Sequence, residues 1–307
     1  MTGIADHAIR AILLVPLGAA LLLAALPGYR LTARLNVLAT MLTFAAALAL
    51  LLGGRPSPGA YLLVDDLNIV FIVLGTLVGF TTSIFSASYI QHELDTGKLT
   101  PGYLRFYHAM YQALMFGMNL ALLANNIGLM WVAIELATLT TVVMVGIYRT
   151  REALEAAWKY FILGSVGIAL ALFGTILVYM AALPVMGQGH DAMVWSVLIR
   201  HAAAFDPSLL NLAFIFLLLG YGTKVGLAPL HAWLPDAHAE GPTPISAVLS
   251  GLLLNVALYA VLRFKLLLAA NPAALAPGPL MVTMGLVSLV FAAFMLYRRR
   301  DIKRLFA

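Results

Sequence analysis

Long apolar runs recur along this chain and constrain its fold more than any other feature. The runs lie at residues 11–27, 35–52, 67–90, 107–126, 127–148, 158–182, 208–227, 243–262 and 278–297. Each is about 17–25 residues long, enough for a helix to cross the hydrocarbon core of a bilayer. Only 10% of the residues are charged, whereas a soluble domain has about 25%. We predict an all-α, polytopic membrane protein with about nine transmembrane helices and no soluble domain.

The two ends of the chain call for separate interpretations. The first apolar run follows a short basic flank, as in a signal peptide, but Tyr29 and Arg30 follow it without a clear small-residue cleavage site. We interpret this run as the first transmembrane helix. At the other end, Ile302, Leu305 and Phe306 look like the start of a further apolar helix. We expect the chain to be truncated at its C-terminus.

The basic residues are unevenly divided between alternate connections. One set has about five, namely Arg10, Arg55, Arg200, Arg263 and Lys265. The other has about eleven, namely Arg30, Arg34, Lys98, Arg105, Arg149, Arg151, Arg298, Arg299, Arg300, Lys303 and Arg304. Lys and Arg accumulate in cytoplasmic loops. We predict a protein of the cell inner (plasma) membrane with its N-terminus outside and its basic C-terminus in the cytoplasm.

Composition excludes several kinds of chemistry. The chain has no cysteine, so it cannot form disulfides, thiolate zinc sites or iron–sulfur clusters of its own. It has no Walker A motif, and nucleotide binding is unsupported. The net charge of +5 could suggest nucleic acid, but the basic residues flank apolar runs, where membrane topology places them. We expect no cofactor in this chain and any redox chemistry in a partner.

The stretch 210–264 is the most informative for function. It begins as an apolar helix, carries Lys224 within the apolar run, and continues through Pro229 into the segment HAWLPDAH. Further helix-breaking residues follow at Gly241, Pro242 and Pro244. A proline frees a backbone carbonyl, and broken helices at membrane depth occur only inside protein or beside a wet cavity. We predict a broken seventh helix around a functional lysine; a lysine snorkelling to the interface is the alternative.

A second charge lies within the fifth apolar run. Glu135 occurs in MWVAIELATLTTVVMV, and a charge deep in a membrane helix is costly unless it is paired or hydrated. Burial disfavours the charged form of a carboxylate or an amine, and an opposite charge nearby favours it. A Glu135–Lys224 pair that can close and open would therefore act as a proton switch. The alternative is a carboxylate satisfied by the hydroxyls of Thr138 and Thr141.

The remaining candidates lie at the edges of apolar runs. Lys159 is either an internal relay or an interfacial anchor, since Glu155 precedes it by one helical turn. His231 and His238 would share a face of a helix, with Asp236 between them. Their spacing matches no common zinc motif, so we predict no metal site. Histidine suits a proton relay near neutral pH.

Several segments resemble one known family: WVAIELATLTT, EAAWKYFILGS, GTKVGLAPLHAWLPDAHAEGPTPISAVLSGLL and the terminal DIKRL. They are similar to the antiporter-like membrane subunits of respiratory complex I. That family also includes subunits of membrane-bound nickel–iron hydrogenases and of multi-subunit sodium/proton antiporters. RTREALEAAWKYFIL and LLANNIGLMWVAIELATLTT look most like the hydrogenase-4 component F branch.

The resemblance implies a fold with two inverted five-helix repeats. Residues 107–268 would be the first repeat, preceded by three transmembrane helices in 1–106. Residues 269–307 would hold the ninth helix and the start of a second repeat. The resemblance covers the whole chain, but only about the first half to two-thirds of a typical member.

The resemblance also implies proton-path roles for Glu135, Lys159 and Lys224. Many members carry a lysine or histidine in the eighth helix, where this chain has Asn255, which cannot carry a proton. We expect partners among other membrane subunits and a peripheral redox arm. The chain itself is then a non-redox subunit, and the sequence leaves open whether it takes part in an enzyme.

Three functions remain open on these grounds. The favoured one is a proton-translocating subunit of a redox-driven complex, hydrogenase-4-like or NADH:quinone oxidoreductase-like. The second is a subunit of a secondary cation/proton antiporter. The third is a truncated scaffold subunit that conducts nothing.

Overall fold

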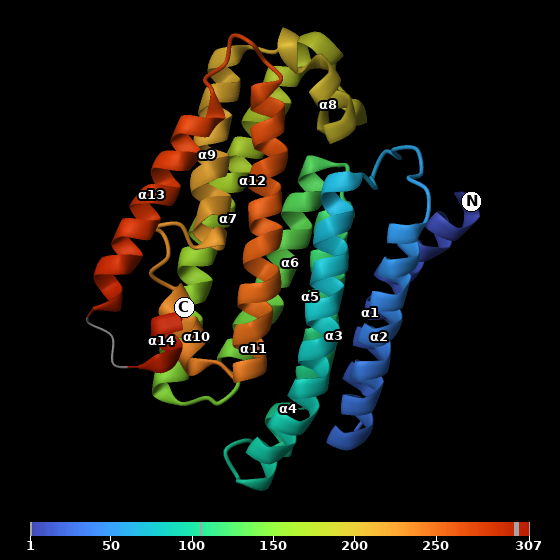
Figure 1. Ribbon diagram of the computed structural model, residues 1–307, viewed down its shortest axis with the longest axis vertical. Coiled ribbons are helices and arrows are strands. Elements are labelled where there is room, and N and C mark those ends of the chain that lie inside the picture. The colour runs from blue at the N-terminus through green and yellow to red at the C-terminus, as the bar shows by residue number, and fades with distance from the viewer. Residues whose placement is uncertain (1, 105, 298–300, 307) are drawn as a thin grey trace.

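A computed structural model describes residues 2–104, 106–297 and 301–306 of the chain, and most of them are helical (Figure 1). The α-helices are α1 (Thr2–Ala25), α2 (Tyr29–Leu52), α3 (Asp66–Asp95), α4 (Pro101–Leu104), α5 (Tyr107–Leu123), α6 (Ile127–Val145), α7 (Arg151–Met186), α8 (Trp195–His201), α9 (Pro207–Val225), α10 (Leu234–Glu240), α11 (Thr243–Val248), α12 (Leu254–Ala269), α13 (Pro277–Leu296) and α14 (Ile302–Phe306). Two 3₁₀ segments cover His190–Met193 and Ala202–Ala204, and a π segment, Leu249–Leu253, joins α11 to α12.

Eight helical segments of the described chain are long and apolar enough to cross a membrane. They match eight of the nine predicted runs. The remaining run, 107–126, is α5, whose 17 residues would span about 25 Å. The predicted all-α polytopic class is confirmed.

The connections between the long helices alternate between two ends of the bundle. We call them the α8 end, at the top of Figure 1, and the α4 end, at the bottom. The larger predicted set of basic residues gathers at the α4 end through Arg30, Arg34, Lys98, Arg149, Arg151, Lys303 and Arg304. The other members of that set, Arg105 and residues 298–300, lie outside the described residues. The alternating connections thus agree with the predicted division of the basic residues between two ends of the bundle.

Polar side chains begin several of the long helices. Asp65 and Asn68 form a reciprocal capping box at the start of α3. The side chains of Asn126, Thr150 and Asp206 accept backbone N–H groups at the starts of α6, α7 and α9. Such caps satisfy donors that the first helical turn leaves free, and they help to set where these four helices start.

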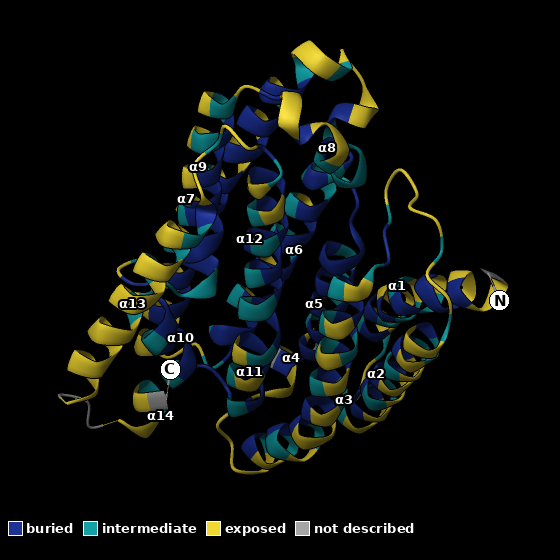
Figure 2. Cartoon of the chain, turned by 45° about the horizontal axis from the view of Figure 1, so that its top comes forward, coloured by how far each residue is buried: buried dark blue, intermediate teal, exposed yellow. Residues whose placement is uncertain are grey.

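The interior of the bundle contains α5, most of whose residues are buried, together with the buried faces of α6 and α12; buried residues are dark blue in Figure 2. Helices α7 and α9 approach each other especially closely. A methyl group at Gly220 would lie 2.5 Å from the backbone nitrogen of Ala171 and 2.6 Å from the carbonyl oxygen of Gly167. Small residues allow such close contact between membrane helices, so the end of α9 is held firmly against α7.

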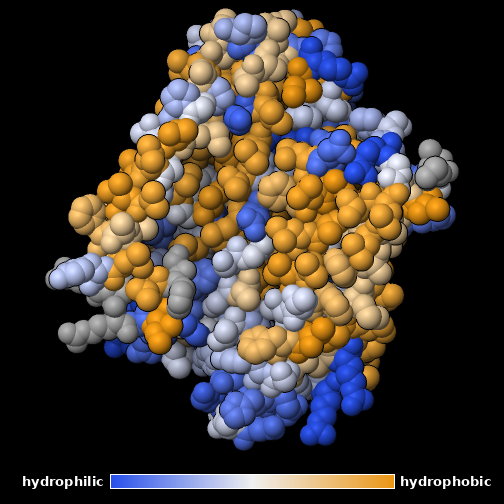
Figure 3. All heavy atoms as spheres, in the orientation of Figure 1, coloured by the Kyte–Doolittle hydropathy of each residue, from blue (hydrophilic) through white to orange (hydrophobic). Residues whose placement is uncertain are grey.

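The outer surface is apolar over its middle and hydrophilic toward the ends, as Figure 3 shows for one face. Helix α13 is the most exposed of the long helices, with Pro277 its only buried residue. This distribution fits a chain surrounded by lipid or by other apolar helices.

The predicted break in the seventh membrane helix is confirmed. Helix α9 ends at Val225, and Gly226 follows in the left-handed conformation with φ 85°, which glycine adopts without steric cost. The chain then turns through Pro229 and becomes helical again in α10. Gly241 and Pro242 separate α10 from α11, and Pro244 lies in the first turn of α11.

Candidate functional site

Lys224 lies in the last turn of α9 and is completely buried. Its Nζ donates a hydrogen bond of 2.7 Å to the hydroxyl of Thr138. The same atom is 3.7 Å from Oε2 of Glu135 and 5.8 Å from the centre of the Tyr160 ring. The ammonium therefore has a polar acceptor, a negative charge and an aromatic face around it.

Glu135 comes from α6, one helical turn before Thr138. Its side chain is 20% exposed, in contrast to the fully buried Lys224. The separation of 3.7 Å is an ion-pair distance but too long for a hydrogen bond. The structure thus brings the two residues together, as the sequence-based hypothesis requires.

The threonines of α6 bind the backbone and the lysine. Thr138 donates to the carbonyl of Ile134 at 3.0 Å and accepts from Lys224. Thr141 lies within hydrogen-bonding distance of two helix carbonyls and 2.7 Å from the Tyr160 hydroxyl. Thr138 therefore holds the lysine of the pair, and the hydrogen bonds of Thr141 go to the backbone and Tyr160.

A glycine of α7 leaves room for the ammonium. A methyl group at Gly164 would lie 2.9 Å from Lys224 Nζ, closer than van der Waals contact permits. The residue at this position therefore decides where the lysine head can sit. The glycines that flank Lys224 in sequence have other surroundings, since Gly220 contacts α7 and Gly226 ends α9.

Trp233 holds the broken end of α9 in place. Its indole Nε1 donates 2.8 Å to the carbonyl of Thr223, in the last turn of the helix. The ring stacks on Tyr160 with 4.6 Å between centroids. A carbonyl near the break is thereby satisfied inside the protein, as membrane burial demands.

A second charged group lies at the α4 end. Lys159 Nζ contacts Glu155 at 2.8 Å and Asp236 at 3.0 Å, and its side chain is 47% exposed. Arg304 of α14 reaches Asp236 at 3.4 Å and Glu240 at 3.1 Å. Lys159 and Asp236, both predicted site residues, are therefore partners in one network that connects α7, α10 and α14.

The two candidate histidines have different surroundings. His231 precedes α10 and packs edge-on against Phe291 of α13, with 5.2 Å between ring centroids. His238 lies in α10 and is buried. Burial, together with the charge of Lys303, lowers the pKa of His238 to about 4, so this imidazole is neutral at pH 7. Within the described residues, no three His, Asp or Glu side chains are arranged to hold a metal ion.

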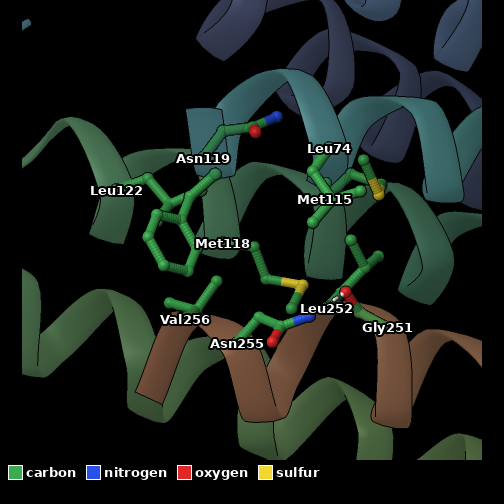
Figure 4. Close-up of a pocket in the computed structure, with 11 residues that line it drawn as sticks. Leu74, Met115, Met118, Asn119, Leu122, Gly251, Leu252, Asn255 and Val256 are labelled. Atoms are coloured by element: carbon green, nitrogen blue, oxygen red, sulfur yellow. Dashed lines mark hydrogen bonds between the residues drawn. The ribbon is translucent and has the colours of Figure 1, made fainter. Parts of the chain in front are cut away.

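Asn255 follows the π segment at the start of α12. Its side chain donates 2.8 Å to the carbonyl of Gly251. A small cavity of about 10 Å³ adjoins it, lined largely by apolar side chains of α3, α5 and α12. Asn119 lines the same cavity, but its amide points away from Asn255 (Figure 4). Asn255 thus bonds within its own helix.

Sequence reasoning missed the residues that surround the lysine head, namely Thr138 as its acceptor, Gly164, Tyr160 and Trp233. Three of them lie in segments already singled out in the sequence: Tyr160 and Gly164 in EAAWKYFILGS, and Trp233 in HAWLPDAH. Hydropathy gives no indication of which side chain faces an ammonium on another helix.

Comparison with known proteins shows the family to which the chain belongs. The family model described as NADH:quinone oxidoreductase/Mrp antiporter, TM matches residues 124–307. The chain belongs to this family. Its match extends over α6, α7 and α9, which supply Glu135, Gly164 and Lys224.

Relatives within the antiporter family include a hydrogenase-4 component F homolog of Methylacidiphilum infernorum. It is 65% identical over 97% of this chain and 62% of that protein. An NAD(P)H-quinone oxidoreductase chain 4 of Gloeobacter violaceus is 31% identical over 65% of this chain and 36% of that protein. The chain therefore spans less than two thirds of the length of these relatives.

Two solved structures share the fold. A chain of the membrane-bound sulfane sulfur reductase, an archaeal respiratory membrane complex, superposes with a TM-score of 0.83 at 22% identity, covering 97% of this chain and 61% of that chain. A chain of respiratory complex I from Thermus thermophilus gives a TM-score of 0.75 at 27% identity, covering 97% and 60%. Both neighbours are subunits of multi-subunit respiratory complexes.

Proposed function

We propose that this chain is a proton-translocating membrane subunit of a redox-driven complex of the hydrogenase-4 or NADH:quinone oxidoreductase type. The observation that carries the proposal is Lys224, an amine with no solvent exposure, 3.7 Å from the carboxylate of Glu135. A buried charge of this kind is costly. Membership of the antiporter family and 65% identity to a hydrogenase-4 component F homolog support the same function.

The pair would work by changing the charge around one amine. Burial disfavours the charged form of an amine, and a nearby carboxylate favours it. Movement or protonation of the partly exposed Glu135 would therefore change whether Lys224 holds a proton. Thr138 keeps the amine in place while this happens. Electron transfer in a partner arm would supply the displacement.

The other site residues would connect this pair to the membrane surface. Lys159 and Asp236 are exposed or half-buried at the α4 end, and His231 and His238 lie on the segment just after the break. A neutral imidazole can both donate and accept a hydrogen bond, which suits it to relay protons. We place the α4 end on the cytoplasmic side, since the larger set of basic residues gathers there.

The test compares Lys224→Ala with Lys98→Ala in inverted membrane vesicles carrying the assembled complex. Lys98 is a matched lysine outside the spanning helices, with a side chain 63% exposed. We expect Lys224→Ala to abolish donor-driven acidification while leaving electron transfer in the peripheral arm measurable, and Lys98→Ala to leave both unchanged. Full acidification with Lys224→Ala would refute the proposal. Ion exchange under an imposed pH gradient without a redox donor would identify a secondary antiporter instead.

A further inference from the structure

A second buried polar cluster lies between α2, α3 and α5, on helices other than those that carry Glu135 and Lys224. These three helices pack against one another on the right-hand side of Figure 1. The cluster is centred on His108, Gln112 and Asn36, whose exposed fractions are 2%, 0% and 0%. Nothing in the proposed proton path uses these residues.

Four polar atoms in this cluster have no hydrogen-bonding partner among the described residues. They are both ring nitrogens of His108, Oε1 of Gln112 and Nδ2 of Asn36. The three side chains are neighbours, since Gln112 follows His108 by one turn of α5 and its Nε2 donates 2.9 Å to Oδ1 of Asn36. A buried polar group without a hydrogen bond destabilises the fold, so a partner shared by these atoms would remove several such penalties at once.

The chemistry of these atoms selects the partner. Asn36 Nδ2 can only donate a hydrogen bond, and Gln112 Oε1 can only accept one. In a neutral imidazole, one ring nitrogen donates and the other accepts. An anion could not donate to Gln112, and a metal cation could not accept from Asn36. Water both donates and accepts, and buried waters typically make two to four such bonds.

The cluster has a short route to bulk solvent at the α4 end. The ring of Tyr29 lies 5.1 Å from that of His108. The same tyrosine lines an open groove of about 540 Å³ between α2 and α3, together with the exposed Arg30 and Arg34. Tyr29 therefore stands between the groove and the imidazole, anchored by a hydrogen bond of 3.1 Å to the carbonyl of Ala87.

Hydroxyl groups continue the polar track on both sides of the cluster. Thr40, one turn beyond Asn36 on α2, lies 2.8 Å from the hydroxyl of Ser83. Near His108, the Ser86 hydroxyl lies 2.8 Å from that of Tyr107. Such pairs can orient neighbouring waters, so the cluster is part of a polar track through the α2–α3–α5 interface.

We propose that His108, Gln112 and Asn36 bind ordered water that communicates with the α4-end groove past Tyr29, making His108 a proton-exchanging site separate from the Glu135–Lys224 pair. The titratable groups that face His108 among the described residues are Tyr29 of α2 and Tyr107 of α5. The water links the imidazole to the groove, and the ring of Tyr29 lies between them.

The test measures deuterium uptake at the C2 carbon of each histidine by mass spectrometry, with the assembled complex in lipid nanodiscs. C2 exchange requires that water reach the imidazole. His92, exposed in the same groove, reports the rate of an accessible ring. We expect measurable deuterium uptake at wild-type His108, slower than at the exposed His92, because C2 exchange passes through the protonated ring and burial disfavours that form. Absence of exchange at His108 in the wild-type protein would overturn the proposal without recourse to any variant.

Variants then locate the water. The double substitution Asn36→Leu/Gln112→Leu should slow exchange at His108 by about tenfold, while Tyr29→Ala should speed it. The matched control is Asn119→Leu, a buried amide further along α5, which should leave the His108 rate unchanged. An unaltered rate in the double variant would show that these amides do not hold the water, and an unaltered rate in Tyr29→Ala would refute the route past Tyr29.

Discussion

Among single residues, the lysine site depends on how much space each neighbouring residue leaves for the ammonium. Gly164 is the clearest case, because a methyl group there would meet the head of Lys224 at 2.9 Å. The head of a lysine is flexible and can move aside, so the helices need not separate. The consequence of a larger residue is then a displaced ammonium within an intact fold.

We predict that Gly164→Ala lowers donor-driven proton translocation severalfold while changing the amount of assembled complex little. The ammonium must move away from Thr138, whose hydrogen bond contributes about 1.5–3 kcal/mol as a charged one. Acidification of inverted vesicles measures the effect. Gly285→Ala, with open space around its methyl position, is the matched control. Normal pumping by Gly164→Ala would show that the position of the ammonium is not critical.

A second residue-scale feature is the ion pair at the α8 end. Arg263 is 3% exposed, lies 2.6 Å from Asp65, and has its guanidinium 4.3 Å from the centre of the Trp195 ring. Burial alone would raise the pKa of Asp65, but the hydrogen bonds from Arg263 and from the backbone of Asn68, with the Arg263 charge, lower it overall. The pair joins the start of α3 to the end of α12.

We predict that Asp65→Asn destabilises the protein by on the order of 3 kcal/mol, because a buried guanidinium loses its counter-charge while asparagine still caps α3. The folded pKa of Asp65 lies below its unfolded value of about 3.9, so the pair stabilises above that pH and the stabilisation is lost as the pH falls through the folded value. Thermal unfolding in detergent from pH 7 to 3 measures this. The control is Asp66→Asn, whose side chain is 94% exposed, and equal stability of the two variants would contradict the prediction.

At the scale of elements, the broken helix depends on the α7–α9 contact. Gly220 touches the backbone of α7 directly, so a side chain there cannot be accommodated by rotation of a neighbouring side chain. The end of α9, with Lys224 one turn further on, would be displaced with it. Stability and function are therefore coupled at this contact.

We predict that Gly220→Ala destabilises the bundle by about 1–3 kcal/mol through overpacking and also lowers proton translocation. Gly222→Ala should be mild, because its methyl group would meet only the tip of Leu227, at 3.3 Å. Melting temperatures from size-exclusion profiles of heated detergent samples distinguish the two variants. Equal melting temperatures would mean that α7 and α9 can separate without cost.

At the scale of the whole molecule, the two ends of the bundle differ in charge. Basic residues gather at the α4 end, and from the positive-inside tendency we predict that this end faces the cytoplasm. The absence of cysteine from the sequence makes the orientation simple to measure, since any introduced thiol is the only one in the chain.

We predict that Ser57→Cys, on the exposed 53–65 connection at the α8 end, reacts with a membrane-impermeant maleimide added outside intact cells. Thr100→Cys, exposed at the α4 end, should react only after the membrane is opened or inverted. Both positions lie in connections outside the spanning helices, so the substitutions leave the bundle intact. The reverse labelling pattern would place the N-terminus in the cytoplasm.

Local sequence was enough to predict the membrane helices, a break in the seventh of them near Pro229, and the buried charges Glu135 and Lys224. These features depend on local properties: hydropathy over about 20 residues decides a span, and glycine and proline decide where a helix ends. Glu135 and Lys224 could be recognised from the sequence because each is a charged residue within an apolar run.

Which side chains contact one another could be known only from the packing of the helices. Lys159 contacts Asp236, 77 residues away, and Lys224 donates to Thr138 rather than leaving that hydroxyl to Glu135. The Arg263–Asp65 pair and the His108 cluster likewise join helices distant in sequence. The physical reason is that hydropathy reports how apolar a helix is, whereas a hydrogen bond between helices depends on their rotation and depth, which the packing of the whole bundle sets.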